Sequence, residues 1–493
     1  RYWRDWSSDV CSSDLNNSLL QGLVPDLLKI SKVTPIDKGG NPFDATNYRP
    51  VSILSSFTQI FEKLVYKQLI NYIEKYNILS QCQFGFRKGH STEQAIIEIT
   101  DNLRKSIDDN LYTCAVFLDF AKAFDTVNHS ILLAKLEKYG IRGIPLKWFR
   151  SYLTDRQQYV SLGNTKSNKQ TIVCGIPQGS TLGPLLFLLY INDISNSSEK
   201  LSFRLFADDT NVFVSSSNPK ELEETINTEL TRVKTWCDVN KLSINHKKTN
   251  FMIIKSAQKR LHTAVTVTIP DNEGSKFYIK QKDHIKYLGV MIDEKVNWQY
   301  HISFIRSRIS RNTGIFYKLR HYLTPIQQRQ IYYNIVYPYI TYAIVAWGST
   351  YKSHISKLQT MQNNIARIIF FATMYGKNTQ SALPLLNLLD ILTINNVYEL
   401  QVLKFVHNWH KQKLPLIFKK SFQYVKEIHS YNTRHASKNN LYKTHFRTNV
   451  GKQSVSCMAV NIWTKLPSEF KNVNTKIFNK KVKQFLLLKQ HSS

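Results

Sequence analysis

Two adjacent carboxylates, Asp208 and Asp209, stand between two short apolar runs, each with the length of a β-strand. The sequence Ala-Asp-Asp-Thr between the runs favours a tight turn. Like charges held at a partly buried turn repel each other, which indicates a compensating cation. A third carboxylate, Asp119, ends the apolar run 112–120, and such a run is typical of a strand covered on both faces. If the three carboxylates meet, they form a hard-oxygen site suited to two Mg²⁺ ions.

Three motifs carry these carboxylates or lie between them in a fixed order along the chain. They are FLDFAKAFDTVNH (117–129), GIPQGSTLGPLLFLLYINDI (175–194) and FADDTNVF (206–213). In this order they resemble the palm of reverse transcriptases, and their extended forms are similar to the non-LTR (LINE-type, jockey-like) retrotransposon branch. The same resemblance extends to NYRPVSIL (47–54), QFGFRKGHST (83–92), LSINHKKT (242–249) and HIKYLGV (284–290). It covers roughly residues 18–490.

The resemblance implies an α+β fold, a right-hand polymerase with fingers, palm and thumb and a mainly helical basic C-terminal region. The expected divisions are fingers at 16–110, palm with part of the fingers at 111–292, thumb at 293–375 and a basic C-terminal domain at 376–493. Residues 1–15 resemble translated adapter sequence, so we expect a non-native or disordered segment there. The family commonly has an endonuclease before the polymerase, and this sequence is expected to lack one.

The resemblance also implies the catalytic and metal-binding residues. Asp119, Asp208 and Asp209 are the expected catalytic residues. Together with the backbone carbonyl of Phe120 they are expected to bind two Mg²⁺ ions, with Mn²⁺ as an alternative. A further carboxylate, Asp125, follows six residues after Asp119, and we expect it to cap the next helix rather than to bind metal.

Five residues are expected to contact the incoming nucleotide. By resemblance, Arg49 and Lys38 on a fingers hairpin hold the triphosphate, since a guanidinium donates two parallel hydrogen bonds to phosphate. Phe124 is the expected gate below the 2′ position of the sugar, Gln178 lies against the new base pair, and Lys248 donates a proton to pyrophosphate or neutralises phosphate. The alternatives are an ordinary edge-strand charge for Arg49 and a core position for Phe124.

Four further residues are expected near the primer and template. Gly179 and Gly289 allow close approach of the backbone to a ligand, and Leu288 precedes Gly289 in the stretch that resembles the primer-grip hairpin. Arg87 is a candidate for a template phosphate contact, with a structural role in its loop as the equal alternative.

The composition indicates a nucleic-acid partner. The chain has 493 residues and a formal net charge of +31, and such an excess of lysine and arginine is typical of proteins that bind polyanions. The six cysteines show no C-x-x-C pair, which favours a reduced compartment without a zinc site. No apolar run reaches the ~18–20 residues that span a bilayer, so no membrane partner is expected.

Hydrophobic periodicity predicts the main helices. The helix 57–76 is expected to bury Ile60, Leu64, Leu69 and Ile73, and Ser91 or Thr92 is expected to cap the helix 93–107. Other expected helices run from Asp125 to about Tyr139, from Asn218-Pro219 onward, from Trp298 to Leu319, and over 325–347, 354–371 and 383–409.

The function that follows is RNA-directed DNA polymerisation, in the target-primed form that the resemblance implies. The expected partners are template RNA, a DNA primer or nicked target DNA, and dNTPs, in a nuclear and cytoplasmic ribonucleoprotein. The alternatives are an intron-maturase-like polymerase and a decayed or domesticated RNA-binding remnant without polymerase activity. Three C-terminal motifs resemble the same elements without a legible mechanism, although their basic and aromatic residues suit RNA; they are His429–Arg434, Thr448–Lys452 and Asn461–Pro467.

Overall fold

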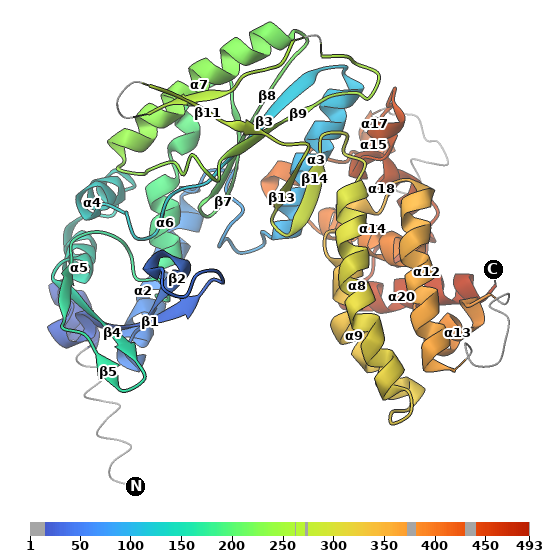
Figure 1. Cartoon of the computed structure of the whole chain (residues 1–493), viewed down its shortest axis with the longest axis horizontal. Coiled ribbons are helices and arrows are strands. Elements are labelled where there is room, and N and C mark those ends of the chain that lie inside the picture. Colours follow the sequence, from blue (N-terminus) through green and yellow to red (C-terminus); the bar gives the residue numbers. More distant parts are fainter. Residues whose placement is uncertain (1–14, 262, 272–274, 372–380, 429–439, 493) are drawn as a thin grey trace.

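The computed structural model describes residues 15–261, 263–271, 275–371, 381–428 and 440–492. Residues 1–14 and the motif His429–Arg434 therefore lie outside the described residues. Figure 1 shows an arch with a sheet at the top. One limb contains both helices and strands, among them the β1–β2 hairpin, and is called the mixed limb; the other consists of helices and is called the helical limb. Helices and sheets are both present in quantity, so the predicted α+β class is confirmed.

The sheet at the top of the arch carries the candidate catalytic strands. Its strands follow the order β12-β9-β3-β8-β7. Their bounds are β12 Lys280–Gln281, β9 Asn250–Ile254, β3 Tyr112–Leu118, β8 Asp209–Ser216 and β7 Ser202–Phe206. Strand β3 pairs antiparallel with both β8 and β9, and every one of its side chains is buried. The prediction of a strand covered on both faces is confirmed.

Alternate side chains of β3 enter two different hydrophobic cores. Cys114, Val116 and Leu118 belong to one core, whereas Ala115 and Phe117 belong to the other. This alternation follows from the two-residue period of a strand. The sheet therefore lies between two cores, and neither face of β3 is exposed to solvent.

The first core joins the sheet to the mixed limb. Its helices are α2 Ser56–Lys75, α4 His129–Lys138, α5 Gly143–Leu153, α6 Gly183–Ile191 and α7 Pro219–Val239. The limb has its own sheet, made of β1 Ile30–Asp37, β2 Tyr48–Ile53, β4 Arg156–Leu162, β5 Thr165–Lys166 and β6 Gln170–Ile172. Strands β1 and β2 pair antiparallel, so the predicted hairpin is present. A small hairpin, β10 Thr268–Pro270 with β11 Lys276–Tyr278, packs on α7.

The second core joins the sheet to the helical limb. Next to the sheet it contains α3 Thr92–Asp108 and the hairpin of β13 His284–Tyr287 and β14 Val290–Asp293. The limb then follows with α8 Gln299–Leu319, α9 Pro325–Ile335, α10 Tyr337–Thr341, α11 Ile344–Trp347, α12 Lys352–Ile369, α13 Leu383–Leu388 and α14 Ile394–His410. Its last helices are α15 Val425–Ile428, α17 Asn449–Lys452, α18 Val455–Thr464, α19 Ser468–Lys471 and α20 Thr475–His491. The division at 110, 292 and 375 stays a prediction.

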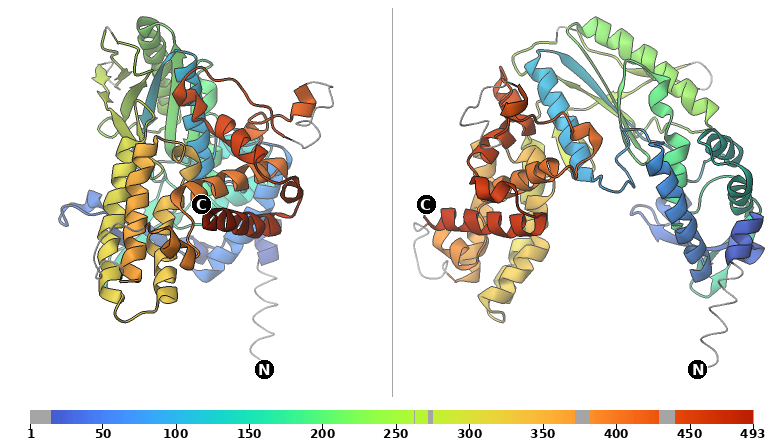
Figure 2. Two further views of the ribbon diagram at one scale, coloured as in Figure 1. Left: turned by 90° about the vertical axis from the view of Figure 1, so that its right-hand side faces the viewer. Right: turned by 180° about the vertical axis from the view of Figure 1, so that it is seen from behind.

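Helix α3 is fastened to the last helices of the chain, as the right-hand view of Figure 2 shows. The Asp101 carboxylate accepts hydrogen bonds from the backbone of Val455 at 2.9 Å and of Ser456 at 3.3 Å. The Asp108 carboxylate accepts from the backbone of Thr448 at 2.6 Å. A β-carbon on Gly451 would meet Asp108 Oδ1 at 2.5 Å, so only glycine allows this approach. The motif Thr448–Lys452 thus has a docking role.

The structure corrects three predictions about helices. Asp125 does not cap α4; its N-cap is Asn128, whose side chain accepts from Ile131 N at 3.1 Å. Ile60 and Leu64 are 44% and 40% exposed, because α2 buries the adjacent stripe that begins with Phe61 instead. The predicted single helix 325–347 is broken into α9, α10 and α11.

Other local predictions are confirmed. Ser91 caps α3 in a capping box with Gln94, and Asn218 caps α7. The predicted helix at 299–319 buries Ile302, Ile305, Ile309 and Phe316 as expected. Among the described residues, no helix combines the length and apolar character needed to cross a membrane.

Candidate active site

The turn between β7 and β8 carries two of the three candidate carboxylates. Phe206 pairs with Asp209, so the hairpin loop consists of Ala207 and Asp208 alone. Ala207 has a φ of 56°, a left-handed conformation that costs an L-residue about 1–2 kcal/mol. The predicted tight turn is confirmed, and it needs support from elsewhere.

The segment before α3 supplies that support. Buried Gln83 accepts two backbone hydrogen bonds through Oε1, from Gly85 at 2.8 Å and from Ala207 at 3.1 Å. A β-carbon on Gly85 would lie 2.4 Å from Ala207 N. These two residues hold the turn in place, and the sequence prediction did not assign them to the site. Their signal is the QFGF stretch, in which the sequence predicted a turn and a template contact for Arg87 but no contact with the 207–208 turn.

Asp119 follows the last residue of β3 and is held by the loop before β9. Asn245 Nδ2 donates to Asp119 Oδ2 at 3.0 Å, and Asn245 N donates to Asp119 O at 2.7 Å. Thr249 Oγ1 accepts from Asp119 N at 3.3 Å. Asn245 therefore orients the carboxylate, a role that the sequence prediction missed although it quoted the surrounding motif.

The three carboxylates influence one another electrostatically. Solvent reaches Asp208 and Asp209, yet enough protein surrounds them to oppose ionisation. Desolvation, Asp208 and Asp119 raise the pKa of Asp209 to about 6. Desolvation and Asp119 also raise the pKa of Asp208, while hydrogen bonding to its own backbone and the charge of Arg49 oppose the rise. A bound cation would relieve this repulsion.

The donor chemistry of these carboxylates fits a hard divalent cation. In the described part of the chain, no group of three or more His, Cys, Asp or Glu side chains is arranged to hold a metal ion. The fit of these three carboxylates to a divalent cation therefore rests on the type of donor atom and on the repulsion between their charges. The metal-ligand assignment, including the carbonyl of Phe120, stays a prediction.

Two cavities meet at the carboxylates. The larger has a volume of about 1140 Å³ and the smaller about 470 Å³. Asp119 and Lys248 line both, whereas Asp208 lines the larger and Asp209 the smaller. The carboxylates thus occupy the boundary between two spaces of different lining.

The larger cavity gathers all five predicted nucleotide-binding residues, Lys38, Arg49, Phe124, Gln178 and Lys248. Phe120 and Gly179, predicted for the metal and for the primer or template, also line it. Gln178 Nε2 donates to Asp125 Oδ1 at 2.8 Å, so Asp125 orients this amide instead of capping a helix. The Phe124 ring stacks on buried Phe187 with a centroid distance of 4.5 Å, which fixes the ring against the wall of the cavity.

Gly179 allows two chain segments to approach each other closely. Its φ is +121°, and a β-carbon there would lie 2.5 Å from Ser52 O in β2. The neighbouring carbonyl of Gln178 accepts from Ser52 N at 2.7 Å. The Pro-Gln-Gly loop is therefore fastened to the β1–β2 hairpin that carries Lys38 and Arg49.

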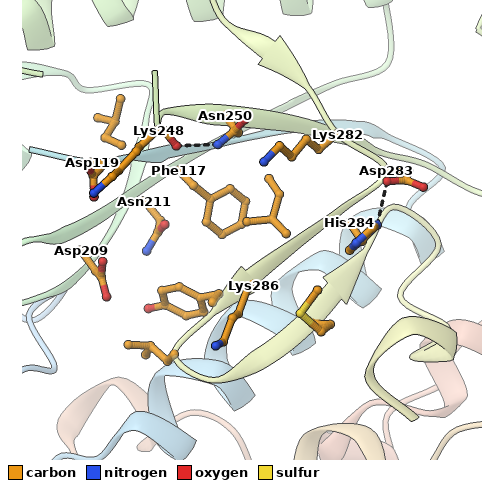
Figure 3. Close-up of a pocket in the computed structure, with 15 residues that line it drawn as sticks. Phe117, Asp119, Asp209, Asn211, Lys248, Asn250, Lys282, Asp283, His284 and Lys286 are labelled. Atoms are coloured by element: carbon orange, nitrogen blue, oxygen red, sulfur yellow. Dashed lines mark hydrogen bonds and ion pairs between the residues drawn. The ribbon is translucent and has the colours of Figure 1, made fainter. Parts of the chain in front are cut away.

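The smaller cavity has a row of basic side chains opposite the carboxylates (Figure 3). Lys282, His284 and Lys286 line it from alternate positions, while Ile285 and Tyr287, which follow His284 and Lys286, are buried. Asp283 Oδ1 bonds His284 Nδ1 at 2.8 Å, and Tyr300 stacks on the His284 ring at 4.0 Å. These three basic residues were not predicted, although the two-residue period of the motif was visible in the sequence.

Two predicted primer or template residues lie outside both linings. Arg87 donates to Ser80 O at 2.8 Å and to Gln83 O at 3.3 Å, and its predicted template contact stays a prediction. Gly289 ends the β13–β14 turn, where a β-carbon would meet the Tyr342 ring at 3.3 Å. Leu288, its neighbour in the turn, does line the smaller cavity.

The order and geometry of these motifs agree with a known family. The sequence profile described as "Reverse transcriptase (RNA-dependent DNA polymerase)" matches residues 36–292, just over half of the chain. The chain belongs to the reverse transcriptase family. The matched residues include all three carboxylates and the cavity-lining residues that lie between residue 36 and β14. The right-hand polymerase fold and the predicted family are therefore confirmed.

Curated relatives come from insect transposons. The chain is 31% identical to the probable RNA-directed DNA polymerase from transposon BS of Drosophila melanogaster, over 72% of this chain and 40% of the relative. It is 27% identical to the RNA-directed DNA polymerase from mobile element jockey of the same species, over 73% of this chain and 40% of the relative. The resemblance to jockey-like elements is confirmed, and the chain spans about two fifths of these relatives.

Solved structures give a weaker likeness. Apo telomerase from Candida tropicalis aligns over 80% of this chain and 67% of its own, with a TM-score of 0.41 and 12% identity.

Proposed function

We propose that the chain is the RNA-directed DNA polymerase of a non-LTR retrotransposon. The observation that carries this proposal is the position of Asp119, Asp208 and Asp209 at the boundary of two cavities that both have basic linings. Nucleotidyl transfer needs this arrangement, because a triphosphate and a primer end must meet at one group of carboxylates.

Divalent ions, Mg²⁺ or Mn²⁺, would be held by the three carboxylates and the carbonyl of Phe120. When bound, two such ions lower the pKa of a primer 3′-hydroxyl and neutralise charge on the triphosphate. Asn245 holds the Asp119 carboxylate through its amide at 3.0 Å, so one ligand is oriented before any ion arrives.

The larger cavity is the proposed nucleotide site. Arg49 and Lys38 project from the β1–β2 hairpin and are exposed, which leaves them available for phosphate oxygens. Arg49 is close enough to Asp208 to lower its pKa. The two basic residues therefore stabilise charge on the leaving group next to the reacting centre.

Phe124 is proposed as the sugar gate of this cavity, because its stacking on Phe187 makes the ring a rigid wall. Phe124→Ala should raise rNTP incorporation strongly and leave dNTP incorporation largely intact. A parallel loss of both activities would instead assign the ring to the core.

The smaller cavity is the proposed site of the primer end. Lys282 precedes β13, which carries His284 and Lys286, and all three line the cavity that contains Asp209. Such a row suits the evenly spaced phosphates of one strand. Asp283 and Tyr300 hold the His284 ring, so this contact is oriented in advance.

The finer biology rests on the relatives and not on the geometry. Relatives named as RNA-directed DNA polymerases of a transposon and of a mobile element support the copying of element RNA. The proposal extends this to target-primed copying at a nicked chromosomal end, in a nuclear and cytoplasmic ribonucleoprotein. An extension assay with a nicked duplex as primer would test the first part, and fractionation of cells that express the chain would test the second.

Primer extension with the purified chain tests the central proposal. Asp119→Ala and Asp208→Asn should abolish Mg²⁺-dependent extension on an RNA template while binding to an RNA–DNA duplex persists. Glu224→Gln, at an exposed site on α7, is the matched control and should keep full activity. Inactive wild-type chain that still binds RNA would favour the RNA-binding remnant, and active Asp208→Asn would remove Asp208 from the mechanism.

A further inference from the structure

A third hollow of the molecule lies far along the chain from the catalytic motifs. It is a groove of about 1190 Å³ on the helical limb, formed by α12, α14, α18 and the extended segment around Leu441. It shares no lining residue with either cavity of the active site. Asn461, Thr464 and Lys465 line it, and they belong to the C-terminal motif 461–467 that the sequence left without a mechanism.

The charge of the groove favours an anion. Lys352, Lys443 and Lys465 are exposed on its lining and make no ion pair with any residue that the structure describes. Glu399 is the one carboxylate among the described lining residues, and it pairs with Lys489 at 3.1 Å. The groove therefore offers three uncompensated ammonium groups to a ligand.

The serine and threonine hydroxyls of the groove each donate a proton to a backbone carbonyl, at distances from 2.7 to 3.0 Å; they are those of Ser349, Thr350, Ser356, Thr360 and Thr464. A hydroxyl has a single proton to donate but two lone pairs to offer. Ser349 Oγ already accepts from Arg104 Nη2 at 3.3 Å, and Thr350 Oγ1 lies 3.3 Å from His354 Nδ1. Ser356, Thr360 and Thr464 therefore present acceptor oxygens, and a ligand that matches them must bring hydrogen-bond donors.

Four carboxamide side chains complete the lining, and Gln359 Nε2 donates to Asn363 Oδ1 at 2.8 Å. The side chains of Asn395 and Asn461 line the groove, and the structure shows no partner for either among the described residues. Carboxamides pair with base edges, where they donate and accept at once. The groove thus combines cations for phosphates, acceptors for hydroxyl donors, and amides for bases.

We propose that this groove binds single-stranded RNA. The 2′-hydroxyl is the donor that RNA has and DNA lacks, and it matches the acceptor oxygens of Ser356, Thr360 and Thr464. Unpaired bases are required because a duplex hides the edges that Asn395 and Asn461 would read. An acidic peptide would satisfy the lysines but would place carboxylate oxygens against hydroxyl oxygens, acceptor against acceptor. This site is independent of polymerase activity.

A second-site binding assay on the full chain tests the proposal. The active-site cleft is first saturated with an unlabelled primer–template duplex. Labelled oligouridine of about ten nucleotides, a length within the usual footprint of single-strand sites, is then titrated by fluorescence anisotropy. Oligodeoxyuridine and 2′-O-methyl oligouridine of the same length are the matched probes, because each lacks the 2′ donor.

The expected result has two parts. Oligouridine should bind about tenfold more tightly than either matched probe, since each lost hydrogen bond to a hydroxyl costs about 0.5–1.5 kcal/mol. Lys352→Gln, Lys443→Gln and Lys465→Gln combined should weaken oligouridine binding at least tenfold and reduce the salt slope by about 2, at ~0.7 per phosphate contact on a single strand.

Matched variants separate this site from general electrostatics. Lys63→Gln, Lys67→Gln and Lys220→Gln combined remove the same charge from exposed lysines that line neither the groove nor the active site, and should leave binding unchanged. Thr360→Val keeps the shape but removes the acceptor, so it should weaken oligouridine and not oligodeoxyuridine. Thermal unfolding and primer extension confirm that each variant is folded.

Three outcomes would overturn the proposal. One is equal affinity for oligouridine and oligodeoxyuridine, which would deny the role of the 2′-hydroxyl. Another is equal behaviour of the two triple variants, which would reduce the binding to overall charge. The third is competition by polyglutamate as effective as that by oligouridine, which would assign the groove to an acidic polypeptide.

Discussion

Two hairpin turns of two residues each border the proposed active site, and they are held in different ways. The β7–β8 turn is fixed by buried Gln83 and by the close backbone of Gly85. The β13–β14 turn, in which Leu288 and Gly289 have φ of 43° and 86°, is fixed by Tyr342, whose hydroxyl donates to Leu288 O. The β7–β8 turn is held by the segment that precedes α3. The β13–β14 turn is held by a residue of the helical limb. The proposed catalytic residue Asp208 therefore lies on the turn that a buried side-chain amide holds.

The largest effect is expected from Gly85→Ala. The added β-carbon would lie 2.4 Å from Ala207 N, a backbone atom that cannot move without shifting Asp208. Primer extension should fall by about 10²-fold, the effect of ångström-scale misplacement, and stability by about 1–3 kcal/mol. Gly314→Ala, where nothing lies within 4 Å of the new β-carbon, is the control. Full activity of Gly85→Ala would show that the turn is not held this way.

A smaller effect is expected from Gln83→Met. This change removes the oxygen that accepts from Gly85 and Ala207 and leaves two buried amides unpaired, at about 1–3 kcal/mol each. Turnover should fall about tenfold, whereas KM for the dNTP should stay constant because no nucleotide contact is lost. Steady-state kinetics separates the effect on turnover from an effect on KM. A change confined to KM would place Gln83 at the nucleotide instead.

The other turn should respond through the primer. Tyr342→Phe removes the hydrogen bond to Leu288 O, which is worth about 0.5–1.5 kcal/mol. KM for the primer should rise severalfold, with KM for the dNTP unchanged. If both constants moved together, the two turns would form one unit and the contrast between them would disappear.

The smallest effect is a pH dependence confined to the catalytic turn. The pKa of Asp209 is raised to about 6, so the folded state favours its protonated form. Ionisation above pH ~4 therefore lowers stability progressively until the pH passes the folded-state pKa. Without divalent ions, Asp209→Asn should raise the Tm at pH ~7.5 by a few degrees and leave it near wild type at pH ~4.5. A constant difference across this range would contradict the raised pKa.

Local sequence patterns predicted strands and caps well because short-range physics decides them. The run ending at Asp119 is almost continuously apolar, and such a run is typical of a strand that lies between two cores. Ser91 and Asn218 cap their helices through side chains that bond amides two or three residues away. The turn at Ala207 and Asp208 was predicted for the same reason.

The predictions that were wrong or missing concern residues whose roles depend on partners far away in the sequence. Asp125 has the right chemistry for a cap, but Gln178 lies 53 residues away and takes its carboxylate. Phe61 and Ile60 both fit a helical apolar stripe, and only the packing of α2 on the first core decides between them. Asn245 and Gln83 act on backbone and carboxylate atoms across 126 and 124 residues. No window of the sequence could show these contacts.

The fastening of α3 to the end of the chain has a consequence for biosynthesis. Thr448 and Val455 lie 340 and 354 residues after the aspartates that they contact. At ~5–20 residues per second, a ribosome takes roughly 20–70 s to make that interval. During this time α3 emerges with two carboxylates awaiting their amide donors. A translation product that stopped before Arg447 would contain all three proposed catalytic aspartates, yet it would have an incomplete fold around them.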